Sequence, residues 1–281
     1  METDRMPSGL AEESSSARPQ SLMFSFLGVY VLGAGVAVSS GSVIDVFGRV
    51  GVSEEAVRST LARMVKRGLL ARHRDGRRVY VGLTDRAEDV LEDGQARIWK
   101  TGAVNRDWDG TWTVVSFSLP DTRRRERHEL RSRLVWEGFG PLHSGQWIAA
   151  GARPVDAVVA ELGLAEHVTV LSSRAAAPTD DRDLVDRAFD TDAIAARYRA
   201  FVDRWGAAAP LPGLPDDLAR QLVLHTDWLQ LVRQDPHLPA QLLPDDWPAI
   251  RADEIFRELA AAYDASSALI ADAVLDVIPV A

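Results

Sequence analysis

The sequence predicts a multidomain α+β protein with an N-terminal winged helix-turn-helix, a central ferredoxin-like α+β domain and a C-terminal all-helical domain. Its 281 residues suffice for two or three domains. A helix–turn–helix pattern followed by a hairpin signal opens the chain, strand and helix patterns alternate in the middle, and helical patterns alone follow. The expected ranges are a disordered, serine-biased tail (1–20), the winged domain (21–100), the ferredoxin-like domain (105–176) and the helical domain (180–281).

Composition limits the class of protein. Apolar residues make up 46% and charged residues 26% of the chain, as is usual for a globular protein with a real core. The absence of cysteine excludes disulfides and cysteine-ligated zinc, and it fits the reducing cytoplasm, where we expect this protein. The apolar run 22–38 contains four glycine or serine residues, so it predicts a buried helix and a turn rather than a membrane span. It also lacks the basic flank of a signal peptide.

Charge is distributed unevenly along the chain. The net charge is −9, yet residues 49–78 contain nine cations and three acids and therefore carry +6. Residues 176–281 contain nine cations and nineteen acids and carry −10. Such asymmetry indicates that one end of the protein meets a polyanion. A solvated basic face explains the charge equally well, so the choice between the two depends on the geometry of the segment.

Residues 53–68 have the pattern of an amphipathic helix. Ser53 is a typical N-cap, Glu54 and Glu55 suit the positive end of the helix dipole, and Gly68 is a typical stop. The expected buried stripe comprises Val57, Leu61, Met64 and Val65. The opposite face is polar or small and can approach another surface closely; it comprises Glu55, Arg58, Ser59, Ala62, Arg63 and Lys66.

The neighbouring segments complete a DNA-binding arrangement. Residues 42–52 predict a short helix and a tight turn, so that the helix 53–68 is the second of a pair and would enter the major groove. Residues 69–84 predict a hairpin at Asp75-Gly76 whose arginine-rich tip would act as a wing and reach the DNA backbone or the minor groove. The first helix of the domain would be 21–33.

The predicted DNA contacts follow from side-chain chemistry. Arg58 and Arg63 can donate bidentate hydrogen bonds to guanine edges or phosphates, and Lys66 can bind a phosphate. The predicted DNA-binding residues are Glu55, Arg58, Ser59, Arg63, Lys66, Arg67, Arg74, Arg77 and Arg78. A winged helix that contacts protein instead of DNA is the alternative for this segment.

Three blocks of the sequence, 51–84, 108–151 and 233–250, resemble the PaaX family, the bacterial repressors of phenylacetic acid catabolism. The resemblance extends over nearly all of residues 21–275. It implies a homodimeric repressor on a palindromic double-stranded DNA operator, released by an aryl-acyl-CoA effector such as phenylacetyl-CoA. It also implies a middle domain that is similar to a CRISPR-associated nuclease fold and that dimerises.

The middle segment predicts strand 111–120, helix 121–138, strand 142–151, helix 153–164 and strand 166–175.

A metal-dependent nuclease needs acids that converge on a divalent ion. Asp121 follows the first strand, but no second acid follows it at metal-ligand spacing, and Asp121 can instead cap the next helix. We therefore predict no catalytic residue, no metal and no cofactor, and a metal-dependent nuclease or nucleotide-processing enzyme is the alternative. The arginines of 123–133 could contact DNA or form ion pairs with Glu126 and Glu129.

The C-terminal third predicts helices at 183–207, 216–234 and 249–275, and its acidity argues against DNA contact. Trp228, Arg233 and Trp247 offer aromatic walls and a cation, which suit an aryl acid or its thioester. These residues are the predicted effector site, and a role in the core is the alternative. A protein–protein adaptor is a third interpretation of the whole chain.

Overall fold

The computed structural model describes residues 9–96, 99 and 104–280. It is an α+β structure with two antiparallel four-stranded sheets, so the predicted α+β class is confirmed. The chain forms two compact units. The first unit comprises 1–100, 204–230 and 255–281, and the second comprises 101–203 and 231–254. The predicted helical domain 180–281 therefore contributes segments to both units.

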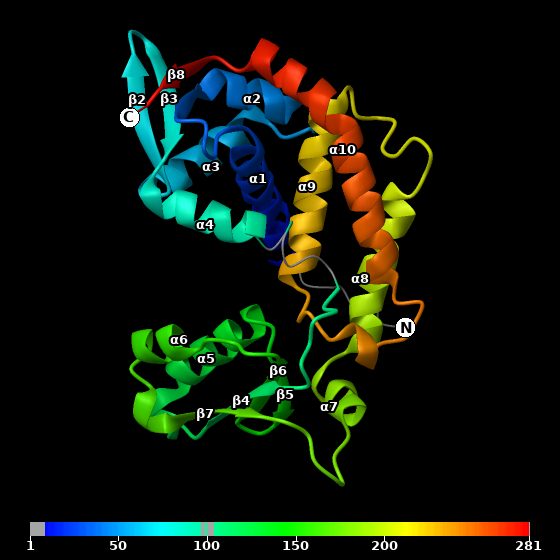
Figure 1. The fold of residues 1–281 in the computed structure, drawn as a ribbon. Coiled ribbons are helices and arrows are strands. Elements are labelled where there is room, and N and C mark those ends of the chain that lie inside the picture. Colours follow the sequence, from blue (N-terminus) through cyan, green and yellow to red (C-terminus); the bar gives the residue numbers. More distant parts are fainter. Residues whose placement is uncertain (1–8, 97–98, 100–103, 281) are drawn as a thin grey trace, which may run out of the picture. The chain divides into compact units, whose positions relative to one another are not determined.

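The first unit is built from the N-terminal third of the chain and two later segments. Its sheet has the order β2-β3-β1-β8 and lies at one edge of the unit, with the helices beside it (Figure 1). Its elements are α1 (Gly9–Tyr30), β1 (Val36–Ser39), α2 (Ser40–Gly48), α3 (Glu54–Lys66), β2 (Leu70–Asp75), β3 (Arg78–Leu83), α4 (Asp85–Ala96) and β8 (Val277–Pro279). Parts of α9 (Asp217–Arg233) and α10 (Pro248–Val274) complete it.

The N-terminal end of this unit differs from the prediction in two respects. Helix α1 already begins at Gly9, where a disordered tail 1–20 was expected; residues 1–8 lie outside the described residues. The apolar run 22–38 continues α1 to Tyr30 but then turns and forms strand β1 instead of ending in a turn. Within the described residues, no helix is both long and apolar enough to cross a membrane.

Helix α3 has the predicted ends. The Ser53 hydroxyl accepts a hydrogen bond from the Ala56 amide at 3.3 Å and caps the N-terminus. Gly68 adopts a φ of 68°, which favours glycine, and the Leu69 amide returns to the Met64 carbonyl at 3.0 Å. The predicted stripe faces inward, since Val57, Leu61 and Met64 are buried and Val65 is half-buried. The stripe packs toward α1 and α2, and this packing leaves the other face of α3 outside.

Strand β8 near the end of the chain joins the sheet of the first unit, and no pattern in the sequence predicts this pairing. Strand β8 pairs antiparallel with β1, with Ala37 opposite Ile278. The backbone just before β8 is also held, because the Ser39 amide donates to the Asp276 carbonyl at 2.8 Å and the Asp276 amide donates to the Ser42 hydroxyl at 2.9 Å. The segment after α10 is therefore fixed beside the start of α2.

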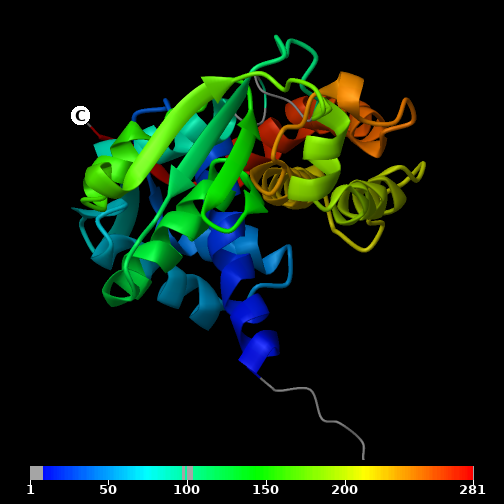
Figure 2. The same ribbon diagram turned by 90° about the horizontal axis from the view of Figure 1, so that it is seen from below.

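The second unit contains the other sheet, in the order β5-β6-β4-β7. Helices α5 and α6 lie on one face of this sheet (Figures 1 and 2), and the core between them includes Leu130, Leu134 and Trp147. The predicted single strand 142–151 is wrong, because this segment belongs to a hairpin that turns at Gly145, whose φ is 74°. The elements are β4 (Trp112–Phe117), α5 (Arg124–Trp136), β5 (Gly140–His143), β6 (Gln146–Ala150), α6 (Asp156–Glu161), β7 (Val168–Ser173), α7 (Asp181–Ala188) and most of α8 (Thr191–Trp205).

Part-buried polar contacts tie the helices of the second unit to its other segments. The Trp112 indole donates to the Asp181 carboxylate at 2.7 Å and connects β4 with α7. The Tyr198 hydroxyl on α8 donates to Asp235, which also accepts from the His237 amide at 2.6 Å. Burial raises the pKa of Asp235 and, together with the nearby carboxylate, that of Tyr198.

Candidate nucleic-acid interface

The outer face of α3 carries every predicted contact residue of this helix. Glu55, Arg58, Ser59, Arg63 and Lys66 are all exposed. They recur at helical spacing opposite the buried stripe, so they share one side of the helix. Arg67 follows as the C-cap and is exposed as well.

Two arginines of this face are oriented by contacts within the helix. Arg58 forms an ion pair with Glu54, with 2.6 Å between Nη2 and Oε1, and both side chains are about 60% exposed. Arg63 donates to the hydroxyls of Ser59 and Thr60, each at 3.1 Å. Exposed pairs of this kind contribute roughly 0–1 kcal/mol, so a phosphate or a guanine edge can replace them at little cost.

The hairpin that follows α3 presents more cations. Asp75 pairs with Arg78 at the end of the β2–β3 ladder, which leaves Gly76 and Arg77 as the two turn residues. Gly76 has a φ of 57°, a conformation that glycine adopts at low cost in tight hairpin turns. Arg74, Arg77 and Arg78 are all exposed near this tip, and the hairpin projects at one edge of the unit (Figure 1).

One arginine of the hairpin contacts an acid from the far end of the chain. Arg78 pairs with Asp276, with 2.6 Å between Nη1 and Oδ2. The Tyr80 hydroxyl donates to the same carboxylate at 3.1 Å. The contacts of Arg78 with Tyr80 and then with Asp276 raise the pKa of its guanidinium group. Sequence reasoning missed Asp276, since no local signal links residues 198 positions apart.

The basic surface, defined here as the nine predicted DNA-binding residues, is therefore exposed throughout and belongs to adjacent elements of one unit. These elements are α3, its C-terminal cap and the β2–β3 hairpin. Eight of the nine residues are cationic or neutral, and Glu55 is the acid. Guanidinium groups arranged in this way can bind phosphates and the acceptor edges of bases.

The predicted effector residues do not form one site within a unit. Trp228 belongs to the first unit, is fully buried and stacks on Phe256, with 4.7 Å between ring centroids. Trp247 and Arg233 belong to the second unit, where the Arg233 guanidinium lies 5.6 Å from the centroid of the Trp136 ring. Their role in effector binding stays a prediction.

Asp121, the possible metal ligand of the nuclease alternative, is exposed. Asp121 opens a short 3₁₀ turn (Asp121–Arg123) before α5, and its side chain meets Arg127 at 3.4 Å. The predicted capping role of Asp121 is wrong, because Arg123 is the N-cap of α5 and makes no side-chain cap bond. Among the described residues, no group of three acidic or histidine side chains is arranged to hold a metal ion.

The arginines of α5 are partly engaged with neighbours. Arg133 pairs with Glu129 at 3.2 Å and with Glu161 on α6 at 3.3 Å. Arg123 donates to the Gly163 carbonyl at 3.2 Å. These contacts agree with the predicted ion-pair surface, and DNA contact by this helix stays untested.

Comparison with known proteins shows three matches in sequence order. A model described as "PaaX-like protein" matches residues 18–87, the "PaaX protein central Cas2-like domain" matches 105–185, and the "PaaX-like protein C-terminal domain" matches 189–273.

Two individual proteins are similar over most of the chain. "Transcriptional repressor PaaX" of Escherichia coli K12 is 25% identical over 247 residues, which cover 84% of this chain and 77% of that protein. The solved structure of "Uncharacterized protein Rv0674 from Mycobacterium tuberculosis" has a TM-score of 0.61 and 25% identity, and the match covers 90% of this chain and 96% of the other. With three PaaX models matched in order along its length, the chain belongs to the PaaX family.

Proposed function

We propose that this protein is a DNA-binding transcriptional repressor that uses a winged helix-turn-helix in its first unit. The exposure of all nine residues of the basic surface on α3 and the adjoining hairpin carries the proposal. The succession of α2, a short turn, α3 and a hairpin supports it, since this is the order of a winged helix-turn-helix. The similarity to a protein named as a transcriptional repressor supports it as well.

In this proposal α3 enters the major groove. Arg58 and Arg63 exchange their present partners for guanine edges or phosphates, while Lys66 takes a phosphate. Arg74 and Arg77 at the hairpin tip contact the neighbouring backbone or minor groove. The acidity of residues 176–281, which carry −10, argues against DNA contact by that part of the chain, because like charges repel.

The proposed protein is a homodimer on a palindromic operator. The element order β4-α5-β5-β6-α6-β7 and the sheet order β5-β6-β4-β7 support a ferredoxin-like middle domain. Its edge strand β7 exposes Val170 and Leu171, which are 44% and 54% exposed. Exposed apolar side chains on an edge strand favour pairing with a second copy. Sedimentation should find a dimer for the natural protein and a monomer for Leu171→Lys; a dimer in both would contradict this interface.

The proposed target is an operon for phenylacetic acid or a related aromatic acid, in the bacterial cytoplasm. An acyl-CoA-type effector such as phenylacetyl-CoA would release the operator. It would do so by binding more tightly to a conformation that fits the operator poorly.

A gel-shift experiment with DNA from upstream of the protein's own operon tests the DNA-binding role. The double variant Arg58→Ala, Arg63→Ala should lose at least about tenfold in affinity, since each good base or phosphate contact contributes roughly 1–3 kcal/mol. The double variant Arg199→Ala, Arg251→Ala removes the same charge from exposed positions outside the basic surface and should keep the natural affinity. Equal affinity of the two double variants would contradict the assignment of α3.

A further inference from the structure

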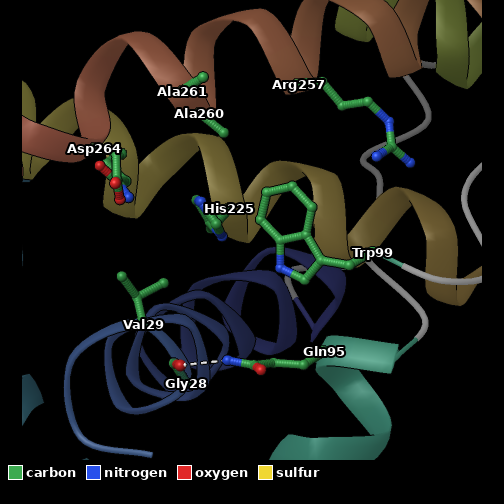
Figure 3. A pocket seen from close by; sticks show the side chains of 10 residues that line it. Gly28, Val29, Gln95, Trp99, His225, Arg257, Ala260, Ala261 and Asp264 are labelled. Atoms are coloured by element: carbon green, nitrogen blue, oxygen red, sulfur yellow. Dashed lines mark hydrogen bonds between the residues drawn. The ribbon is translucent and has the colours of Figure 1, made fainter.

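The first unit contains a cavity of about 460 Å³ lined by Trp99 and by residues of α1, α4, α9 and α10. Figure 3 shows Trp99 and His225 in the middle of this cavity, with Arg257 extending from α10 toward the side of Trp99. Asp264 lies at the opposite end, beyond His225 (Figure 3). A cavity of this size accommodates a small organic molecule, because ligand pockets measure roughly 300–1,000 Å³.

Two aromatic rings line the cavity, those of Trp99 and His225, and both pack against Phe256 outside it. The Trp99 ring lies 6.0 Å from the His225 ring and 5.3 Å from the Phe256 ring, measured between centroids. His225 and Phe256 meet edge to face at 5.3 Å, and Trp228 stacks behind Phe256. Trp99 keeps 42% of its surface exposed, so its ring is available to a further planar group.

The side chain of His225 contributes a buried polar atom without a partner in the described part of the chain, and such an atom indicates a binding site. The side chain is 6% exposed, and its Nε2 has no hydrogen-bond partner within the described residues. Burial lowers the pKa of His225 to about 4, against a smaller opposing effect of Asp264, so the ring is neutral near pH 7. An unsatisfied buried polar atom costs roughly 1–3 kcal/mol, and a ligand that offers a hydrogen bond to Nε2 recovers part of this cost.

The two ends of the cavity differ in charge. Arg257 contributes a guanidinium group at one end, and Asp264 contributes a carboxylate at the other. An anionic or carbonyl head group is therefore attracted toward Arg257 and repelled from Asp264. Gln95 closes the floor, where its amide donates to the Gly28 carbonyl at 2.8 Å and ties α4 to α1.

We propose that this cavity binds an arylacyl group, with its ring against Trp99 and His225 and its carboxylate or acyl oxygen toward Arg257. The free acid and its thioester share this chemistry. The binding of this ligand is independent of the repressor function proposed above. Only its role as the effector rests on that proposed function.

The cavity is linked to the basic surface through α10. Arg257 and Asp264 lie on this helix, which ends at Val274, and Asp276 follows two residues later with its contact to Arg78. The Leu275 amide still donates to the Ala271 carbonyl at 2.8 Å, so helical hydrogen bonding continues to the residue before Asp276. No flexible linker therefore separates α10 from the contact between Asp276 and Arg78. A ligand that displaces α10 changes the position of Asp276 and hence of Arg78 and β8.

Isothermal titration calorimetry of the full chain with phenylacetate, phenylacetyl-CoA and coenzyme A tests the site. Saturable binding of at least one arylacyl probe is expected, and it should weaken by about tenfold or more in Ala261→Leu, which narrows the cavity, and in Arg257→Gln. The matched controls are Ala262→Leu and Arg251→Gln, which lie on α10 and do not line the cavity. The controls should bind like the natural chain.

Each outcome decides the proposal. Binding of phenylacetate identifies the free acid as a ligand, and binding of phenylacetyl-CoA alone identifies the thioester. Failure of both probes to bind, coenzyme A binding as tightly as its thioester, or equal affinities of cavity and control variants would overturn the site. Thermal melts identify variants that fail to fold. If Ala261→Leu fails to fold, the affinity of Arg257→Gln alone tests the site, because Arg257 is exposed and its replacement should leave the fold intact.

A parallel gel shift separates this site from the proposed function. If the natural protein binds the ligand but no operator fragment, the repressor function fails and the cavity assignment stands. If it binds the operator but neither arylacyl probe, the cavity assignment fails alone. Release of operator by the ligand in the natural protein, and its loss in Arg257→Gln, is the result expected if the ligand is the effector.

Discussion

Arg78 at the base of the hairpin turn and Asp276 near the end of the chain form an ion pair with 2.6 Å between Nη1 and Oδ2. Asp276 also accepts from the Tyr80 hydroxyl, and its backbone is held by Ser39 and Ser42. A fixed carboxylate thus lies against a cationic hairpin that we propose to meet phosphates. It competes with DNA for Arg78, because both partners are anionic.

Replacing this carboxylate should strengthen DNA binding. Asp276→Asn frees Arg78 and removes one negative charge, and we expect the affinity at low salt to rise about threefold, since exposed ion pairs contribute roughly 0.2–1 kcal/mol. Fluorescence anisotropy with an operator duplex measures the change. Asp272→Asn is the matched control, because it removes the same charge from an exposed position on α10. A similar gain in both variants would attribute the effect to net charge rather than to the ion pair.

The hairpin arginines should determine part of the salt dependence. Arg74→Ala, Arg77→Ala removes two exposed cations near the tip. If both contact phosphates, the slope of log K against log salt should become shallower by about 2, at roughly 0.9 per phosphate. Binding titrations across a range of salt concentrations measure this slope. The double variant Arg199→Ala, Arg251→Ala should keep the natural slope, and an unchanged slope in the hairpin variant would remove the hairpin from the interface.

The stability of the protein should fall in mild acid because of His225. Its pKa in the folded state is about 4, below the ordinary value of 6.5, so the unfolded state takes up the proton first. The free energy of unfolding is therefore unaffected by protonation of His225 above about pH 6.5. It decreases as the pH falls from there toward 4, by at most roughly 3 kcal/mol.

Denaturant unfolding at about pH 7.5 and about pH 4.5 checks this expectation. His225→Gln should reduce the loss of unfolding free energy between the two conditions. A residual loss is expected, because burial also lowers the pKa of His237 in the second unit to about 4. The same pH dependence in His225→Gln and in the natural chain would show that His225 does not contribute.

Gly140 should be intolerant of a side chain. A Cβ at this position on β5 would overlap the carbonyl oxygen of Ala188 and the ring of Phe189. Gly140→Ala should therefore lower the free energy of unfolding by about 1–3 kcal/mol, the usual cost of overpacking. Gly213→Ala is the matched control, since the described residues leave its surroundings open and its effect should stay within about 1 kcal/mol. Calorimetric melts compare the two.

Several features of the first unit could be read from the sequence because their causes are local. The N-cap at Ser53, the stop at Gly68 and the hairpin at Gly76 each depend on a few consecutive residues, and the structure has all three. The exposed face of α3 followed from helical spacing alone. By contrast, the strand β1 was hidden in an apolar run, and the strand assigned to 142–151 belongs to a hairpin, because short segments carry too little pattern to separate strand from helix or one strand from two.

The sequence by itself determined the α+β class, the ends of α3, the hairpin turn and the outward set of cations, since these depend on periodicity, capping and turn residues within a few positions. Only the tertiary structure decided that β8 pairs with β1, that Asp276 holds Arg78, and that Trp99, His225 and Arg257 line one cavity. The physical reason is distance along the chain. Contacts between residues more than a hundred positions apart are selected by the packing of the whole unit, and no local preference of the partners encodes them.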